Sequence, residues 1–293
     1  MASKEGGGDL NIDFHIKKAK STKKLTLIFT FFMMFVYVII ILYPLFNMVI
    51  SSFKSTRDII RYPFALPESI SFKSYYTVWI EKKFYNYFIN SVIVTSVSML
   101  FVVLLGSMAS FGVSRYQYKG NTFLYMLFLS GIMLPLKAAL IPLYMIINKL
   151  GLSNSLTCII LINIASGLPS TVFILSGFMR TFPKDLEYAA RIDGCSDWRI
   201  YWNVVMPVVI PGVAIVTIYN AVPIWNDFFF PLVFIQSDAL RTLPVGLNSF
   251  IGQYKTDWGL MFTGLSISII PMLLLYLSMS NQFIRGMTGG AIK

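Results

Sequence analysis

The sequence predicts an all-α, polytopic membrane protein with six transmembrane helices. Hydrophobic residues make up 56% of its 293 residues, whereas soluble domains average about 45–50% apolar residues. The mean hydropathy is +0.69. Apolar runs recur along the chain, and each is about as long as a helix that crosses a bilayer. We expect one transmembrane domain over residues 24–293, after a polar tail at residues 1–23, with spans at about residues 25–50, 87–113, 121–147, 156–179, 208–234 and 259–283.

Basic residues indicate how the first span is oriented. Lys17, Lys18, Lys20, Lys23 and Lys24 precede the first apolar run, and lysines beside a span favour the cytoplasmic side, where they meet anionic lipid. Six spans then place both termini in the cytoplasm. A cleaved signal peptide is the competing interpretation, but the run is too long and no cleavage site follows it. Because the lysines cluster here, the net charge of +11 does not indicate a nucleic-acid-binding surface.

The second and third spans carry features that affect packing. Small residues recur every four positions from Gly106 to Ser114, a spacing that lets two helices approach closely. Pro135 and Pro142 are expected to interrupt the third span, and such a break is tolerated only against protein or a wet cavity. Lys137 lies between them. A charge inside a span is a candidate functional group, and the alternative is a side chain that extends to the outer interface.

Residues 182–211 form the longest polar segment in the second half of the chain and are predicted to fold as two short helices with a break. Pro183 suits the first helical position, because its missing N–H is no loss there. Gly194 ends this helix, since glycine adopts the left-handed conformation without steric cost. Ser196 can cap the second helix.

Aromatic residues are spaced in that second helix so as to share one face. The spacing i, i+3, i+4, i+7 predicts an amphipathic helix with an aromatic face formed by Trp198, Tyr201, Trp202 and Val205. An ordinary interfacial loop is the alternative interpretation of the whole segment.

The segment PKDLEYAARIDG, followed by the aromatic helix and then MPVVIP, resembles the EAA loop of ABC importer permeases. The residues that match the family pattern are Ala189, Ala190, Asp193, Gly194 and Pro207. Tyr188 stands where the family has Glu, and Cys195 stands where it has Ala. MLPLKAALIPLYMIINKLGL, WNDFFFPLVF, TLPVGL and the terminal MTGGAIK resemble further segments of the carbohydrate-type branch, which includes the inner subunit of maltose importers. The resemblance covers residues 25–293.

This resemblance implies a permease subunit in a bacterial cell (inner) membrane that forms half of a sugar translocation pathway. It implies three partners: a second transmembrane permease subunit, a cytoplasmic ATPase dimer and an external sugar-binding protein. No cofactor is expected in this chain, because ATP and Mg²⁺ belong to the ATPase. The sequence agrees, since it contains no G-x-x-x-x-G-K-[ST] phosphate loop, no H-E-x-x-H and no Cys/His cluster. Neither a catalytic residue nor a metal ligand is expected.

Two groups of site residues follow. The resemblance assigns coupling to the ATPase to Leu186, Glu187, Ala189, Ala190, Asp193 and Gly194. Because Tyr188 replaces the family's Glu, Glu187 or Asp185 is expected to supply any ion pair to the ATPase; the alternative is that these residues only cap and shape the loop. For the sugar path we expect Asn220, Trp225, Asn226 and Asp227, because sugars need hydrogen-bonding groups and an apolar ring face. The alternative is that the amides join helices and the aromatic rings face lipid.

Other functions remain as alternatives. An importer of a sugar-like phosphate, such as a glycerophosphodiester, belongs to the same branch. A membrane enzyme acting on lipid-linked sugars would need a carboxylate pair or a metal site, and only Asp227 is predicted inside a span. A self-contained secondary transporter would need more ionisable groups within the membrane. The external loop at residues 237–258 resembles the segment that contacts the binding protein, and a plain connecting loop is its alternative.

Overall fold

The computed structural model describes residues 7–181, 183–252 and 256–288, with side chains described between Lys24 and Ile284. In chain order the helices are α1 (Gly7–Ser51), α2 (Thr56–Arg61), α3 (Lys73–Tyr76), the π-helix η1 (Thr77–Glu81), α4 (Phe84–Arg115), α5 (Asn121–Met133), the 3-10 helix η2 (Leu136–Ala139), α6 (Leu140–Lys149), α7 (Leu156–Thr181), α8 (Asp185–Ile192), α9 (Asp197–Ile200), the π-helix η3 (Tyr201–Val205), α10 (Met206–Val208), α11 (Ile210–Trp225), α12 (Phe229–Phe234), the 3-10 helix η4 (Asp238–Leu240), α13 (Leu243–Asn248) and α14 (Trp258–Thr288). Within these described residues the only β-type pairing is an isolated bridge between Ile251 and Thr256.

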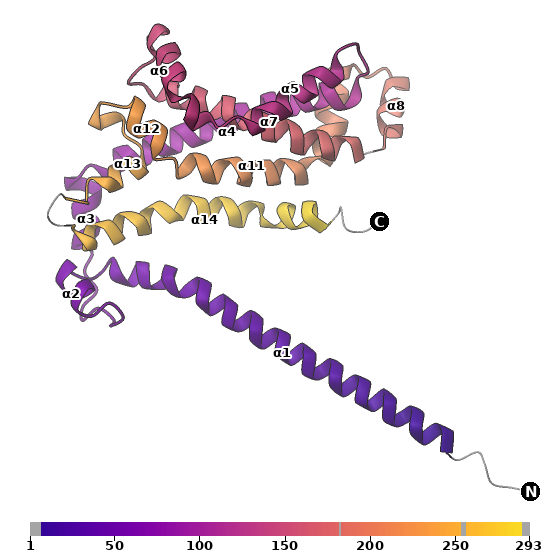
Figure 1. Ribbon diagram of the computed structural model, residues 1–293, viewed down its shortest axis with the longest axis horizontal. Helices are drawn as coiled ribbons and strands as arrows, with labels where there is room; N and C mark the ends of the chain where they lie inside the picture. Colours follow the sequence, from indigo (N-terminus) through magenta and orange to yellow (C-terminus); the bar gives the residue numbers. More distant parts are fainter. Residues whose placement is uncertain (1–6, 182, 253–255, 289–293) are drawn as a thin grey trace, which may run out of the picture.

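Four long helices lie side by side and set the frame of the molecule. Figure 1 shows α4, α7, α11 and α14 running in similar directions, with α8 at one end and α2, α3 and α13 at the other. α1 meets α14 near Ser52, whose carbonyl accepts a hydrogen bond from Thr263 Oγ1 at 3.1 Å. It then diverges from the rest of the chain. The loop segments therefore gather at two opposite ends, as expected for a protein that crosses a membrane.

The described residues contain four candidate spans, or up to six if each of two bent helix pairs counts as one span. In the described part of the chain, four helices are long and apolar enough to cross a membrane: Lys24–Ser51, Phe84–Arg115, Leu156–Thr181 and Trp258–Ile284. Two further helix pairs pass the same test but bend, Asn121–Met133 with Leu136–Lys149 by 85° and Asp197–Val208 with Ile210–Trp225 by 76°.

The breaks in the bent spans follow local chemistry. α5 ends before Leu134, which takes an extended conformation because it precedes Pro135. Pro142 does not break the chain as predicted, since it lies in the first turn of α6, where no N–H is needed. The predicted fifth span at residues 208–234 is wrong at its end. α11 stops at Trp225, three residues leave the helix, and α12 follows as a separate segment.

The predicted tail also differs from the structure. Helical backbone begins at Gly7, so most of residues 1–23 continue into the first span rather than forming a separate segment. Residues 1–6 of that tail, and residues 289–293 at the other end of the predicted domain, lie outside the described residues.

The close approach predicted around Gly106 occurs between α4 and α7. A Cβ atom at Gly106 would overlap Thr171 Cγ2 of α7, and Thr171 is completely buried. Ser110, one turn later, is also fully buried, and its hydroxyl donates to the Gly106 carbonyl at 2.6 Å. The small residues of α4 therefore allow the helix contact that the sequence predicted.

We expect Gly106→Ala to destabilise the protein, because the added methyl group has no space between α4 and α7. Overpacking of this kind costs about 1–3 kcal/mol. The matched control is Gly112→Ala in the same helix, where an added Cβ atom meets nothing within 4 Å. Thermal unfolding in detergent should show a lower midpoint for Gly106→Ala and an unchanged or higher one for Gly112→Ala. Equal midpoints would contradict the packing.

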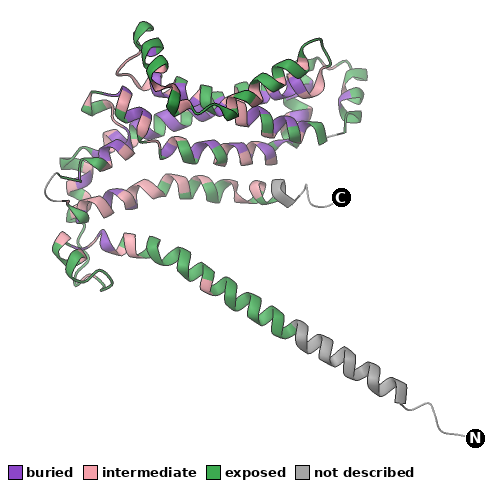
Figure 2. Cartoon of the chain, viewed as in Figure 1, coloured by how far each residue is buried: buried purple, intermediate pink, exposed green. Residues whose placement is uncertain are grey.

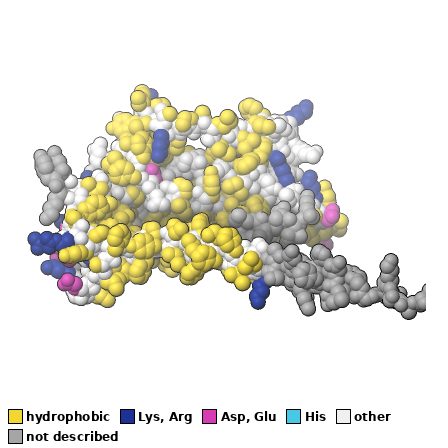
Figure 3. Space-filling view, turned by 60° about the horizontal axis from the view of Figure 1, so that its bottom comes forward, with side chains coloured by type: hydrophobic (Ala, Val, Ile, Leu, Met, Phe, Trp, Pro, Cys, Tyr) yellow, Lys and Arg dark blue, Asp and Glu magenta, His cyan; other side chains and the backbone are white. Residues whose placement is uncertain are grey.

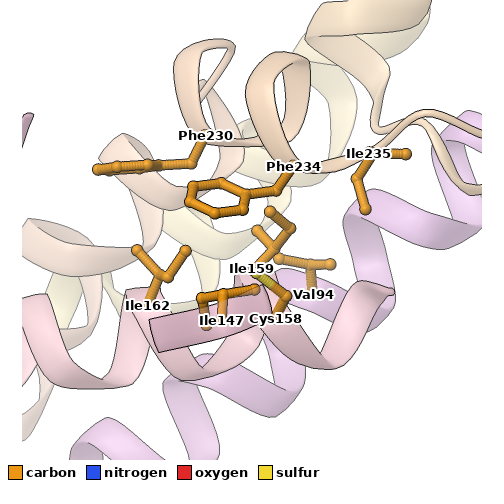
Figure 4. Packing of buried hydrophobic residues seen from close by; sticks show 8 residues of the cluster. All are labelled: Val94, Ile147, Cys158, Ile159, Ile162, Phe230, Phe234 and Ile235. Carbon is orange, nitrogen blue, oxygen red and sulfur yellow. The ribbon is translucent and has the colours of Figure 1, made fainter. Parts of the chain in front are cut away.

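An apolar cluster joins the helix ends opposite α8. Figure 4 shows Val94, Ile147, Cys158, Ile159, Ile162, Phe230, Phe234 and Ile235 converging from α4, α6, α7 and the α12 region. This cluster holds α6 and α12, the short segments that follow the two broken spans, against α7. It thereby fixes the position of both breaks.

Much of the remaining surface is apolar. The most hydrophobic part of α1 has no buried residue, and Figure 2 colours this helix as exposed along most of its described length. Figure 3 shows hydrophobic side chains spread over the exposed helices, with Lys and Arg mostly toward the ends. Such a surface suits lipid or another membrane subunit rather than water.

Candidate functional site

The polar segment after α7 forms the predicted pair of short helices. α8 covers Asp185–Ile192 and α9 covers Asp197–Ile200. Gly194 lies between them with φ +78°, the left-handed conformation predicted for it. Ser196 caps α9 as predicted, because its hydroxyl accepts from the Arg199 N–H at 3.4 Å. Pro183 is not the first helical residue as predicted, since α8 begins two residues later.

A buried ion pair fixes α8 to the end of α4. Arg115 Nε lies 2.7 Å from Glu187 Oε1, and the two side chains are only 3% and 7% exposed. Arg115 is the last residue of α4. Glu187 therefore points into the helix bundle, whereas the resemblance placed it among residues facing the ATPase. Its carboxylate is engaged inside this chain, and exposed Asp185 lies on the outer side of α8.

Two further contacts hold the segment in place. The hydroxyls of Tyr201 in η3 and Ser107 in α4 lie 2.7 Å apart, and Tyr201 is 2% exposed. Arg191 Nη2 lies 2.7 Å from Asp197 Oδ1 across the break between α8 and α9. Burial, together with a hydrogen bond to Asp197, raises the pKa of the Tyr116 hydroxyl above its usual value. Residues from both short helices thus contact the region where α4 ends.

The outer side of the segment carries exposed apolar side chains beside the charged ones. Ile192 is 87% exposed, and exposed Leu186 and Tyr188 lie on the same short helix. Ala189, Asp193 and Gly194 are also exposed, whereas Ala190 is half-buried. Exposed apolar side chains on a firmly held loop are typical of protein–protein contacts.

The predicted aromatic face of the second helix is present, because the rings of Trp198, Tyr201 and Trp202 pack on one another with centroids 4.9 to 5.8 Å apart. Trp198 is exposed, whereas Tyr201 and Val205 are buried. Trp202 lies between these extremes and packs on the Tyr201 ring, with ring centroids 4.9 Å apart. This face therefore runs from the surface at Trp198 to the buried side chains of Tyr201 and Val205.

Gly194→Val is expected to reduce transport several-fold while the protein stays in the membrane. No atom lies within 4 Å of a Cβ atom there, so the effect comes from the backbone, which costs a non-glycine residue about 1–2 kcal/mol. Gly194→Asn is the control, because asparagine tolerates this conformation. Substrate uptake into proteoliposomes, at matched protein levels, measures the difference. Wild-type uptake by Gly194→Val would argue against a role for this turn.

A cavity of about 640 Å³ opens where α5, η2, α7 and α11 meet. Its polar lining comes from both broken spans and from α7: Lys137, Asn163, Ser166, Ser170, Tyr219, Asn220 and Asp227. Sites for small ligands typically measure about 300–1,000 Å³, so the cavity is large enough for a sugar unit.

Of the four residues predicted for the sugar path, the structure brings two to this cavity. Asn220 and Asp227 line it. Asn220 also joins helices, since Nδ2 donates to Thr171 Oγ1 at 3.3 Å. Trp225 is 4% exposed, and its Nε1 donates to the Ser268 carbonyl at 3.0 Å, away from the cavity lining. Asn226 Nδ2 donates to the Val222 carbonyl at 2.9 Å, and its side chain does not line the cavity.

Sequence reasoning missed the polar residues of α7. Asn163, Ser166 and Ser170 line the cavity. Their spacing of three and four places them on one side of a helix, and this pattern was visible in the fourth apolar run. Lys137, the charge singled out in the third span, lies on the cavity wall, and its Nζ is 5.4 Å from the centre of the Phe229 ring.

The external loop at residues 237–258 packs closely on α4. Tyr87 Oη donates to Asp238 Oδ2 at 2.9 Å, and the Leu243 N–H donates to Ser91 Oγ at 2.8 Å. A Cβ atom at Gly246 would overlap the Tyr87 ring. The described residues of this loop thus belong to the packed end opposite α8, and contact with a binding protein stays a prediction.

Comparison with known proteins identifies the class. The family described as binding-protein-dependent transport system inner membrane component matches residues 102–288. The chain belongs to this family. The probable ABC transporter permease protein YurM of Bacillus subtilis is 37% identical over 260 residues, covering 89% of this chain and 86% of YurM. The multiple sugar-binding transport system permease protein MsmG of Streptococcus mutans is 33% identical over 278 residues, covering 94% and 100%.

A solved structure agrees with this permease at the level of fold. A chain of a bacterial ABC transporter that imports the acidic polysaccharide alginate superposes with a TM-score of 0.77, over 89% of this chain and 98% of that chain. The two are 20% identical. A second structure of an alginate ABC transporter contains an alginate-bound periplasmic protein and superposes with a TM-score of 0.62.

Family membership confirms several predictions. The chain is a multi-pass inner-membrane component and a transport permease, not an enzyme. The resemblance to the carbohydrate-type branch is confirmed by relatives such as the melibiose/raffinose/stachyose import permease protein MelC of Bacillus subtilis, 35% identical over 228 residues, which cover 78% of this chain and 83% of MelC. The alternatives of a lipid-linked-sugar enzyme and a self-contained transporter are thereby set aside. An ABC permease of this family works with an ATPase and a partner permease.

Proposed function

We propose that this permease is one half of the translocation pathway of an ATP-driven importer for a neutral oligosaccharide. It pairs with a different permease chain, and residues 182–211 dock on a cytoplasmic ATPase dimer that binds ATP and Mg²⁺. An external binding protein delivers the sugar. The names of relatives that import melibiose, diacetylchitobiose or arabinooligosaccharides support the substrate class.

The observation that carries this proposal is that α8 exposes apolar side chains while a buried ion pair holds it to α4. Ile192 and Leu186 face outward, while the Arg115–Glu187 pair joins the same helix to the end of α4. A partner that binds α8 thus moves α4 with it. ATP binding changes the conformation of the ATPase. If the ATPase contacts α8 differently in its two conformations, it can shift the permease between two states.

The orientation of the chain follows from the charge pattern. The lysine cluster before the first span favours the cytoplasm. Figure 1 shows that α1 begins, and α14 ends, toward the same side as α8. These observations support an orientation with both termini and the docking loop in the cytoplasm and with the segments around α2, α3 and α13 outside.

A sugar-like phosphate is the second candidate substrate, because Lys137 places a cation on the cavity wall. Asp227 lines the same cavity and offsets that charge. Because the charges of Lys137 and Asp227 offset each other, a neutral substrate is favoured.

Co-purification with partners tests the function. The tagged permease is isolated in mild detergent, its partners are identified by mass spectrometry, and the ATPase rate is measured with a binding protein and a panel of sugars. We expect a second permease and an ATPase in stoichiometric amounts, with stimulation by a neutral oligosaccharide. Isolation of the chain alone, or stimulation only by a phosphate ester, would refute the proposal.

A further inference from the structure

We propose that this permease contacts the sugar directly, through a subsite for a neutral glycosyl unit formed by Lys137, Asn163 and Asp227. This proposal rests on the function proposed above and adds the place and chemistry of one binding site. The three residues line the same cavity but come from three different elements: η2, α7 and the segment between α11 and α12.

The two broken spans converge on this cavity. Lys137 lies on η2, directly after the break at Leu134 and Pro135. Asp227 lies in the three-residue break between α11 and α12. Irregular backbone at membrane depth is tolerated only where it is buried in protein or lines a cavity. Both breaks therefore place a charged side chain on one wall, and the apolar cluster beneath α6 and α12 fixes them there.

Two polar groups of the wall lack partners. Asn163 is only 5% exposed, and among the described residues its Nδ2 donor has no hydrogen-bond partner. Asp227 Oδ1 accepts from the Phe229 N–H at 3.1 Å. No side-chain donor in the described part of the chain reaches its other oxygen, Oδ2, which is also buried. Buried polar groups without a partner are unfavourable, so a ligand that supplies both a donor and an acceptor is favoured.

A sugar hydroxyl is the group that fits this pair, because it donates and accepts at once. One hydroxyl can donate to Asp227, and another can accept from Asn163 or from the Lys137 ammonium. The carboxylate and the ammonium balance each other, so the wall carries no net charge for an acidic sugar to match. Phe230 and Ile224 supply apolar lining against which a sugar ring can pack.

The test uses the whole complex of both permeases and the ATPase in proteoliposomes with its binding protein. The probes are raffinose, diacetylchitobiose and arabinotriose as neutral sugars and digalacturonate as an acidic one. For the sugar that the wild type imports, sugar uptake per ATP hydrolysed is compared among Lys137→Gln, Asp227→Asn and the control Lys149→Gln. Lys149 ends α6, is exposed and lies outside the cavity lining.

We expect the two cavity variants to lose at least fivefold in neutral sugar carried per ATP. Lys149→Gln should match the wild type both in sugar carried per ATP and in stimulation of the ATPase by the loaded binding protein. Unchanged transport in both cavity variants would overturn the subsite while leaving the proposed function intact. If the wild type imports only digalacturonate, and only Lys137→Gln abolishes that uptake, the proposed neutral character of the subsite is overturned. If the wild type imports none of the neutral sugars, the proposed function itself fails.

A labelling experiment tests the subsite a second time, in case the cavity variants do not assemble into the complex. Ser166→Cys introduces a thiol on the cavity wall, with Cys195→Ala in the background and Cys158 fully buried. The transported sugar should slow its modification by 2-aminoethyl methanethiosulfonate at least threefold. Ser153→Cys, in the turn before α7, should show no protection. Equal rates with and without sugar at Ser166→Cys would overturn the subsite.

Discussion

Glu187→Ala is expected to abolish coupled transport and to destabilise the loop that we propose contacts the ATPase. The substitution removes the carboxylate that faces the buried Arg115 guanidinium at 2.7 Å. Removing one member of a buried ion pair costs about 3–5 kcal/mol, because the remaining charge stays out of water. We expect uptake to fall at least tenfold, and the thermal midpoint of the purified complex, followed by tryptophan fluorescence, to fall with it.

Two variants control this result. Asp185→Ala removes an exposed carboxylate from the same helix, so its midpoint should match the wild type. The double substitution Arg115→Met with Glu187→Met removes both charges and fills the space with apolar atoms, which often restores stability. Its midpoint should exceed that of Glu187→Ala. If Glu187→Ala melts and transports like the wild type, the pair does not hold α8 to α4.

Ile192→Asp is expected to release the ATPase without unfolding the permease. Ile192 is 87% exposed, so its replacement disturbs little inside the chain. At the centre of an interface, a charge in place of an apolar residue costs at least about 2 kcal/mol, which weakens binding roughly 30-fold. The amount of ATPase that co-purifies with the permease, and the ATPase rate, measure the loss.

The control for Ile192→Asp is Ile60→Asp. Ile60 lies on α2 and is 67% exposed, at the end of the molecule opposite α8. It should retain the ATPase in stoichiometric amounts. Retention of the ATPase by Ile192→Asp, with an unchanged thermal midpoint, would mean that the apolar side of α8 is not the docking surface.

The spans that the sequence predicted well are those in which hydrophobicity alone decides the structure. The runs that became α4, α7 and α14 are long and apolar, and their bounds lie within a few residues of the prediction. The fifth span was predicted too long, because WNDFFFPLVF is apolar enough to continue a helix. Asp227 there accepts from the Phe229 N–H, and this local bond competes with helical hydrogen bonding.

The site was less predictable, since it depends on contacts between distant segments. Gly194 acts through its own backbone conformation, and the Ser196 hydroxyl accepts a local hydrogen bond from the Arg199 N–H, so both roles were visible in the sequence. The inward position of Glu187 depends on Arg115, which belongs to another span. Trp225 was expected in the path because it adjoins Asn226 and Asp227, yet its ring packs on Phe88 with centroids 6.0 Å apart. Packing against distant segments decides which side of a buried helix faces a cavity, and the residues next to it in the sequence do not reveal this.

The π turn η3 makes the connection between α8 and α11 tolerant of a change in chain length. A π turn holds one more residue than an α turn, so the extra residue is an insertion within an otherwise continuous helical segment. Deleting exposed Asn203 would let this segment close as an ordinary helix without removing a buried side chain. One turn would still connect the two ends of the segment, so Glu187 would stay beside Arg115 and Ile192 would stay exposed. Loss of this one codon is therefore expected to damage the subunit less than the deletion of a residue from α8, where each residue turns the helix by about 100°.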